Sequence, residues 1–415
     1  MKNGILFLRV IALAAITGLA MTACSNGNDR NETISTTYTI IYDYANGSDI
    51  FTVSGLRSGE RVAKPAADKT RAFDPAEHGL AGLWKDGAEY TFVGWYNGEA
   101  VWNFETDTIK NADITLTAKW NAPESLADPD DIGEMLKYIN GDGREGSYTL
   151  IVGKDMEAGS QTLGQDRDLT LVGADTERTI QLTGTGALFT VRDASGSLTL
   201  GNNITLKGVS PNNNALVHIS GGASLTMEAG SKITGNANNT DAAHQAGGIY
   251  FTGTGSFAMN GGEISGNSAR GELSGGGIYI GGHDNVYDNS IFTMRGGAVI
   301  SGNTAAGANS GGGVRLDRGA VFTMYDGIIS DNKVTGTSGA GGVRATNSIF
   351  RIVSGTVYGK NEGANSNTAE GNSSNDAFLG VTGQAQYGAF DGDAFNGTDF
   401  ESADDTIKVT NGIKE

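Results

Sequence analysis

Few residues in this 415-residue chain are spaced as a catalytic or metal site requires. Residues 141–146 match the glycine pattern of a dinucleotide-binding loop, but we expect them to follow a helix and open a strand, which is the wrong context. Residues 391–393 begin like a calcium loop, yet Phe395 occupies the third ligand position. The histidines show no metal-ligand spacing: His78, His218, His244 and His283. We therefore predict no metal and no cofactor.

The single cysteine, Cys24, predicts lipid attachment rather than a disulfide. It follows two early basic residues and an apolar run at 10–20 that is too short to span a bilayer. Met21-Thr22-Ala23-Cys24 resembles the lipobox of bacterial lipoproteins, in which the cysteine is diacylated. We predict a signal peptide at 1–23, a flexible tether at 24–35, and an exported protein anchored by lipid at the outer membrane or cell surface. An ordinary signal peptide with an incidental cysteine is the alternative.

A repeated segment at 246–361 predicts the main architecture. Glycine pairs followed by an aliphatic residue begin at 247, 276, 312 and 341, and a short apolar triplet headed by phenylalanine follows each pair. Strands that alternate at period two, in a loose repeat of about 30 residues, predict a right-handed parallel β-helix with three strands per coil. A left-handed helix would show a period of six residues. Roughly nine coils at about 4.8 Å each give a rod of about 40 Å.

An asparagine closes each repeat, and two roles are open for this set. The side chains can stack as an amide ladder, in which each satisfies a neighbour's backbone and tolerates left-handed turn geometry. They can also line a sugar-binding face. We predict the structural ladder, formed by Asn236, Asn267, Asn303, Asn332 and Asn361.

One repeat, between Gly276 and Gly312, is seven residues longer than its neighbours. Because core strands must keep their register, the extra residues are expected to bulge from a corner. They combine an aromatic ring, a histidine and two carboxylates, a mixture suited to sugar or protein contact. We predict a ligand site at His283, Asp284, Asn285, Tyr287 and Asp288, with a solvated insertion as the alternative.

Residues 36–120 differ in composition, because aromatic residues are concentrated there. Several short segments of this region resemble the Listeria-Bacteroides repeat, also called the internalin B-repeat: Tyr38-Thr39-Ile40, Phe92-x-Gly94-Trp95-Tyr96, Trp102-x-Phe104 and Leu116-x-Ala118-Lys119-Trp120. The resemblance implies a small β-grasp-like domain of a bacterial surface protein. One departure is a longer insertion between Pro65 and Tyr90, where the family has a short link.

Residues 121–145 are expected to form a linker and a helix that covers the open end of the coils. Asp128 is the predicted N-cap, and Pro129 fits the first helical position. Four apolar residues then share one face: Ile132, Met135, Leu136 and Ile139. The coils follow over 146–415, with a last strand at 406–409.

The coil region resembles the pectate-lyase-like superfamily and the repeats of predicted bacterial surface lipoproteins. Enzymes of this fold need clustered carboxylates, or a base with calcium, whereas these repeats carry Ser, Thr and Asn between coils. A net charge of −18 argues against a nucleic acid partner. We predict a monomeric, non-enzymatic surface protein for adhesion or for binding protein or glycan ligands of a host or neighbour. A polysaccharide lyase or glycoside hydrolase is the alternative.

Overall fold

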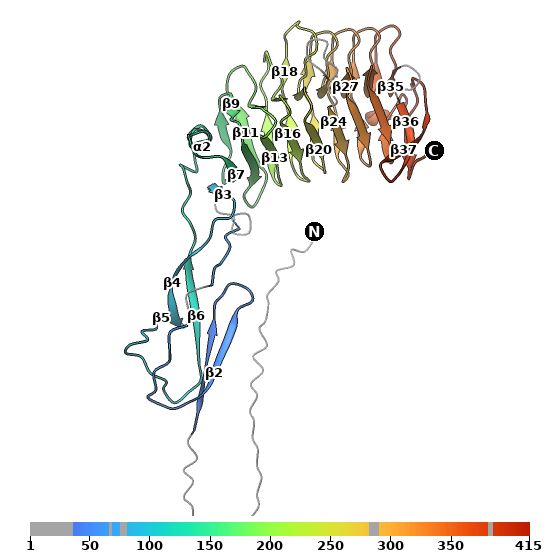
Figure 1. Ribbon diagram of the computed structural model, residues 1–415. Helices are drawn as coiled ribbons and strands as arrows, with labels where there is room; N and C mark the ends of the chain where they lie inside the picture. Colours follow the sequence, from blue (N-terminus) through green and yellow to red (C-terminus); the bar gives the residue numbers. More distant parts are fainter. Residues whose placement is uncertain (1–35, 66–68, 75–80, 282–289, 381–384) are drawn as a thin grey trace, which may run out of the picture. The chain divides into compact units, whose positions relative to one another are not determined.

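The computed structural model describes residues 36–65, 69–74, 81–281, 290–380 and 385–415 (Figure 1). These residues form almost only β-strands. They pack as two compact units: one contains the first two strands and Gly94–Ala118, and the other contains Asp68–Val93 and Lys119–Glu415. The second unit is a stack of parallel strands, and the predicted all-β class with a parallel β-helix is confirmed.

The first unit is built on a mixed five-stranded sheet. Its spatial order is β2 (Ile50–Leu56), β1 (Tyr38–Asp43), β6 (Ile114–Asn121), β4 (Thr91–Asn97) and β5 (Ala100–Val101). β1 pairs in parallel with β6 and antiparallel with β2. The buried ring of Tyr42 lies edge-on to that of Trp95, with ring centroids 5.4 Å apart, so this tryptophan belongs to the core.

Each coil of the second unit contributes one strand to each of three long sheets. The eleven-stranded sheet runs β3 (Gly82–Lys85), β7 (Gly146–Val152), β10 (Arg167–Gly173), β13 (Ser197–Leu200), β16 (Ser224–Met227), β20 (Ser256–Met259), β24 (Ile291–Met294), β28 (Val321–Met324), β32 (Ile349–Ile352), β36 (Ala385–Asp391) and β37 (Ala394–Asp399). The ten-stranded sheet runs β39 (Ile413–Lys414), β38 (Ile407–Thr410), β33 (Gly355–Val357), β29 (Ile328–Ser330), β25 (Val299–Ser301), β21 (Glu263–Ser265), β17 (Lys232–Thr234), β14 (Ile204–Lys207), β11 (Arg178–Leu182) and β8 (Met156–Ala158). The eight-stranded sheet runs β35 (Phe378–Leu379), β31 (Val343–Thr346), β27 (Val314–Asp317), β23 (Ile278–Ile280), β19 (Ile249–Phe251), β15 (Val217–Ser220), β12 (Phe189–Arg192) and β9 (Gln161–Leu163).

The inner side of the coils is a single apolar core in which equivalent residues stack. Phe257, Phe292, Phe322 and Phe350 pair in register, and their successive ring centroids are 4.5, 4.2 and 4.8 Å apart. All four are fully buried. Because each ring packs on the ring of the next coil, the same residue type recurs once per repeat.

A fourth, short ladder lies at one corner of the coils. It consists of β18 (Ala237–Asn238), β22 (Ser268–Ala269), β26 (Thr304–Ala305), β30 (Lys333–Val334) and β34 (Thr368–Ala369). The prediction of three strands per coil did not include it. Two-residue strands are too short to show a period-two alternation, so the sequence pattern could not reveal them.

The glycine pairs are required where consecutive coils approach most closely. A Cβ on Gly276 would lie 2.2 Å from the carbonyl oxygen of Gly312, and one on Gly312 would lie 2.4 Å from that of Gly341. Real Cβ atoms do not approach other heavy atoms this closely. A larger residue would therefore push two coils apart.

A helix, α2 (Ile132–Ile139), covers one end of the core with the four predicted apolar residues, all of which are buried. The predicted N-cap was wrong by three residues: the side chain of Asp131 accepts from the Glu134 amide, at 3.1 Å. Asp128 instead caps a preceding turn and accepts from the Asp130 amide. Pro129 lies in that turn rather than in the helix. No helix in the described segments is long and apolar enough to cross a bilayer.

The ends of the sheets are covered by antiparallel strands. β3, which belongs to the insertion between Pro65 and Tyr90, pairs antiparallel with β7. Its Trp84 packs with Phe73, Ile151 and Ala174. At the other end β37 and β38 pair antiparallel with β36 and β33. These strands occupy backbone groups that would otherwise form open edges. A short 3₁₀ turn at Gly363–Asn365 interrupts the last coils.

Candidate functional site

The asparagines form a column along one corner of the coils. The Asn267 side chain donates to the Asn303 side-chain oxygen at 3.1 Å, and Asn303 donates to Asn332 at 3.0 Å. Each also donates to a backbone carbonyl one coil below, as Asn303 does to Ile264 at 2.9 Å. Asn236 joins the column through its backbone N–H, which donates to the side-chain oxygen of Asn267. These side chains are buried, so they satisfy backbone groups and cannot line a sugar-binding face.

The last member of the column is Asn367, and Asn361 lies outside it. Asn332 donates to the Asn367 side-chain oxygen at 3.0 Å, and Asn367 is fully buried. Asn361 is exposed and has a left-handed φ of 66°. The 3₁₀ turn at Gly363–Asn365 lengthens this corner. Asn367 is the ladder residue because it lies directly before the short strand β34. The first asparagine after β33 is Asn361, and it does not belong to the column.

Two sets of predicted site residues lie outside the described residues. The first is Cys24, the predicted lipid attachment point. The second is the predicted ligand loop, with His283, Asp284, Asn285, Tyr287 and Asp288.

The outer side of the eight-stranded sheet carries a column of large polar residues. The backbone register aligns His218, Tyr250, Tyr279, Arg315 and Arg344, one from each successive strand from β15 to β31. The Tyr250 and Tyr279 rings stack with centroids 5.3 Å apart. The corresponding outer positions of the eleven-stranded sheet hold small residues in four successive coils, Thr226, Ala258, Thr293 and Thr323, and an arginine, Arg351, in the next. We call the five large residues of the eight-stranded sheet the outer column.

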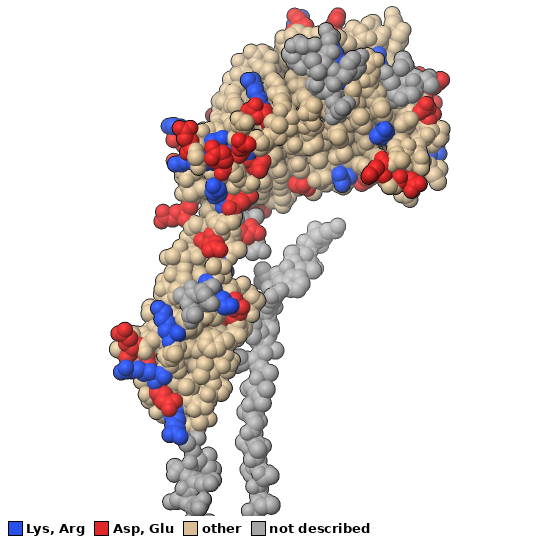
Figure 2. Space-filling view, viewed as in Figure 1, with Lys and Arg blue, Asp and Glu red and all other residues tan. Residues whose placement is uncertain are grey.

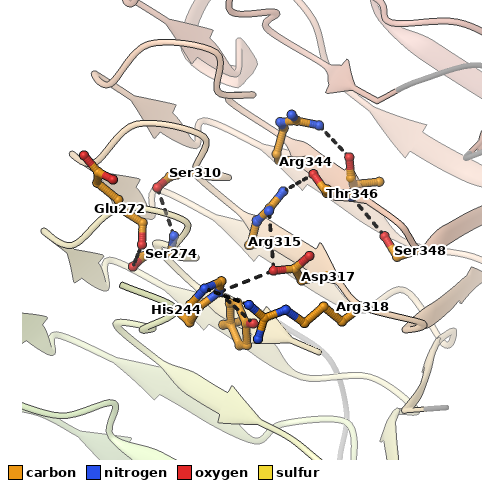
Figure 3. Close-up of polar contacts among 12 residues, drawn as sticks. His244, Glu272, Ser274, Ser310, Arg315, Asp317, Arg318, Arg344, Thr346 and Ser348 are labelled. Atoms are coloured by element: carbon orange, nitrogen blue, oxygen red, sulfur yellow. Dashed lines mark hydrogen bonds and ion pairs between the residues drawn. The ribbon is translucent and has the colours of Figure 1, made fainter. Parts of the chain in front are cut away.

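Arg315 is the most deeply buried charge of the outer column, with 1% of its side chain exposed. Its Nη1 donates to the Thr346 hydroxyl at 2.8 Å, and its Nη2 lies 3.6 Å from Oδ2 of Asp317 (Figure 3). Asp317 ends the same strand, β27, and is also buried. The Nε of Arg315 is buried without a hydrogen-bond partner among the described residues. This guanidinium is therefore only partly satisfied by the protein.

His244 closes the cluster from the loop before β19. Its Nδ1 lies 3.3 Å from Oδ2 of Asp317 and 3.1 Å from the Tyr279 hydroxyl, and its Nε2 lies 3.3 Å from Nη2 of Arg318 (Figure 3). A guanidinium only donates, so Nε2 must be the acceptor and the proton must be on Nδ1. His244 thus joins Asp317 to Arg318. Its loop is held by the backbone, because the His244 amide donates to the Glu272 carbonyl at 3.0 Å.

Burial sets the protonation of this cluster. Burial lowers the pKa of Arg315, and the charge of Asp317 opposes that shift. Burial also tends to raise the pKa of Asp317, but the hydrogen bond from His244 and the charge of Arg315 outweigh it and lower the pKa. For Tyr279, burial and the Asp317 charge both raise the pKa. At neutral pH Asp317 is therefore ionised and Tyr279 is neutral, while Arg315 remains a cation.

Two recesses open on this side of the sheet. One, of about 390 Å³, is lined by His244, Leu273, Arg315, Asp317, Arg318, Thr346 and Asn347. The other, of about 470 Å³, is lined by Arg192, His218, Ser220, Gly221, Tyr250, Thr252 and Gly253. On the face of the coil unit shown in Figure 2, charged side chains gather toward the two ends, and the surface between them is largely uncharged. We call the recess lined by Arg315 the arginine recess and the recess lined by Tyr250 the tyrosine recess.

The chemistry available in the arginine recess is charge recognition. Among the described residues that line it, the recess has two guanidinium groups, Arg315 and Arg318, and one carboxylate, Asp317. Both ring nitrogens of His244 are already engaged. No group of three or more His, Cys, Asp or Glu residues that could hold a metal occurs in the part of the chain that the structure describes.

The sequence reasoning missed this cluster, although a signal was present. The residue after each glycine pair and aliphatic residue is Tyr250, Tyr279, Arg315 or Arg344. That position points outward on a strand and breaks the identity of the repeat. The spacing of His218 and His244 gave neither residue a role; His218 lies on the outer side of β15, and His244 is a partly buried member of the cluster.

Comparison with known proteins gives one family match, which covers Gly94–Ala118 of the first unit and a few residues on either side. The family model of the Listeria-Bacteroides repeat domain matches residues 85–119, within the segment 36–120 that resembles it. The chain matches no curated protein and no solved structure. The repeat domain is typical of surface proteins, which indicates a surface-associated repeat protein.

Proposed function

We propose that this protein is a non-enzymatic, lipid-anchored binding protein of the bacterial surface, and that its ligand face is the outer side of the eight-stranded sheet. The observation that carries the proposal is the outer column. In the coils where the eleven-stranded sheet has Ala258 and Thr323, this sheet has Tyr250 and Arg315, beside two recesses. Aromatic and arginine side chains are the residues that contribute most to binding macromolecules. The role that fits is adhesion or capture of a protein or glycan, by a monomer.

The enzymatic alternative is a polysaccharide lyase or glycoside hydrolase on a pectate-lyase-like β-helix. Glycoside hydrolysis uses a pair of carboxylates, one as acid and one as base or nucleophile. Among the described residues that line it, the arginine recess has one carboxylate, Asp317, which contacts Arg315 and His244. His244 has no nitrogen left to act as a base toward a ligand. These contacts favour binding over catalysis.

The membrane partner follows from Cys24. We propose that a diacylated Cys24 anchors the chain at the outer membrane or cell surface, and that residues 25–35 are the tether. Cys24→Ser removes the only thiol and is expected to shift the protein from the membrane fraction to the soluble fraction. Membrane association that is unchanged after detergent-free washing would contradict a lipid anchor.

A screen of the full-length protein, in non-ionic detergent, on glycan and protein arrays tests the binding role. We expect a ligand whose signal falls at least tenfold with Tyr250→Ala, because this ring lines the tyrosine recess. Tyr325→Ala is the matched control, since Tyr325 is a partly exposed ring next to β28 of the eleven-stranded sheet. A ligand lost equally with both variants would contradict the proposed face. Cleavage of any arrayed glycan would favour the enzyme.

A further inference from the structure

We infer that β2, the outer strand of the five-stranded sheet, takes up an extended segment of a partner protein as an additional strand. The segment that fits is uncharged and has apolar residues on both of its faces. β2 belongs to the first unit, so the inference goes beyond the proposed ligand face on the coils and does not depend on it.

β2 differs from the other strands at the edges of the described sheets. It is seven residues long and contains no charged residue and no proline. The other edge strands have four residues or fewer, except β37, which contains Asp399. Short length, charge and proline are features that prevent an edge from pairing with another chain. Among the edge strands of the described sheets, β2 alone has none of them.

The backbone of Ile50–Val53 is regular and is paired on one side. These four residues pair with Ile40–Asp43 of β1, and the register shifts only after Val53. No other described strand pairs with β2, which is the last strand in its sheet. The row of N–H and C=O groups on its second side can therefore bond to an added strand.

The exposed side chains of β2 define the chemistry of the partner. The ring of Phe51 stacks on that of Tyr42 in β1, with ring centroids 4.7 Å apart, yet Phe51 remains 42% exposed. Ile50 faces the other side of the sheet and is 62% exposed. An added strand lies about 4.8 Å from β2, so its side chains opposite these two would cover both. Burial of apolar surface therefore favours a segment that is apolar on both faces.

Two segments of the chain itself fit this edge less well than a foreign segment does. The tether predicted at 24–35 has one aliphatic residue, Ile34, and no aromatic residue, so it cannot cover both exposed side chains. If Ile50–Val53 of two copies paired antiparallel, Phe51 would lie opposite Thr52 of the second copy. A foreign segment has neither restriction, so the exposed side chains favour a partner protein.

Fluorescence anisotropy with the full-length protein in non-ionic detergent tests the inference. The probe is the labelled peptide Gly-Ser-Thr-Val-Ile-Val-Thr-Ser-Gly. Two further peptides keep its side chains but carry N-methyl groups, one on every even-numbered residue and the other on every odd-numbered residue. Because successive N–H groups of a strand point to opposite edges, each methylated peptide lacks the donors of one edge.

Ile50→Lys places a charge on the proposed edge, and Val101→Lys is its matched control. Both residues are aliphatic and 62% exposed, and they lie on the two edge strands of the same sheet, β2 and β5. Neither belongs to the core, so both variants are expected to fold. Thr52→Lys repeats the test at a second exposed position of β2.

We expect the wild-type protein to bind the unmethylated peptide. One methylated peptide is expected to lose at least tenfold in affinity, while the other keeps its affinity. Ile50→Lys and Thr52→Lys should each weaken binding at least tenfold, and Val101→Lys should leave it unchanged. Absence of binding by the wild-type protein, equal affinities of the two methylated peptides, or equal effects of Ile50→Lys and Val101→Lys would each overturn the inference.

Light scattering on the same samples tests for a second copy. A dimer that dissociates with Ile50→Lys and persists with Val101→Lys would overturn the inference in favour of pairing between two chains. A monomer in all samples supports a foreign segment.

The array ligand distinguishes failure of this inference from failure of the proposed function. If the peptide does not bind while Tyr250→Ala loses the array ligand, the inference is wrong and the proposed function stands. If Ile50→Lys loses the array ligand and Tyr250→Ala keeps it, the edge of β2 is the binding site and the proposed ligand face is wrong instead.

Discussion

The inner side of the coils and the outer side of the eight-stranded sheet are built by the same repeats, yet they differ in uniformity. Inside, Phe292, Phe322 and Phe350 stack ring on ring because each coil must fit the next. Outside, equivalent strand positions change from Tyr279 to Arg315. Stacking between coils holds the inner position to one residue type, whereas the outer position takes different large residues, of which Tyr279 and Arg315 are also buried. This difference supports the proposed ligand face on the outer side of the eight-stranded sheet.

The largest effect on stability is expected from the inner stack. Phe322→Ala leaves a cavity between Phe292 and Phe350, and we expect a loss of about 3–5 kcal/mol in the free energy of unfolding. Thr293→Ala, on the outer side of the neighbouring strand, should change it by about 0.5 kcal/mol or less. Urea unfolding followed by circular dichroism measures both. Equal losses would remove the distinction between the two sides.

The next effect concerns the asparagine column. Asn303→Ala removes the acceptor of the Asn267 backbone N–H and a donor to the Ile264 carbonyl, and a buried group left without a partner costs about 1–3 kcal/mol. Asn361→Gly is the control, because Asn361 is exposed and glycine accepts its left-handed φ. Thermal unfolding should show a clear decrease for the first variant alone. Similar melting temperatures for both would mean that the column adds little to stability.

A smaller, pH-dependent effect is expected at Asp317. Its pKa is lowered in the folded protein, so the stability it adds is present above the usual Asp range and is lost as pH falls through the lowered value. Asp317→Asn should cost about 1–3 kcal/mol at pH 7, because Arg315 loses its charged partner. The difference from wild type should shrink as the pH falls below about 3.9. A difference that stays constant with pH would show that the Asp317 charge does not stabilise the fold.

Much of the fold could be predicted because stacking repeats the same inner residues at one interval. Phenylalanine, glycine-pair and asparagine positions recur for this reason, and the apolar face of α2 follows from its spacing. The residue at which the helix begins and the pairing of the insertion were harder to predict. Asp128 and Asp131 are both residues that can cap a helix. Only the turn that contains Pro129 makes Asp131, rather than Asp128, the N-cap. The insertion that forms β3 pairs with β7, about 65 residues away, and no local pattern encodes that pairing.

The candidate site was less predictable because it depends on loops that cross several coils. His244 meets Asp317 and Arg318, which lie more than two repeats later in the chain. Only the register of the sheet and the course of the loop bring them together. The break in the repeat at Arg315 was visible in the sequence, but its partners were not.

A library with all substitutions at inner residues Phe292 and Phe322 and at outer residues His218, Tyr250 and Arg318 tests the central claim most directly. The displayed protein would be sorted once for protease resistance and once for binding the array ligand. We predict that inner substitutions lose both properties, and that outer substitutions keep protease resistance but lose binding. Outer substitutions that keep binding, or that lose it only when protease resistance is lost, would contradict the assignment of this side of the sheet as the ligand face.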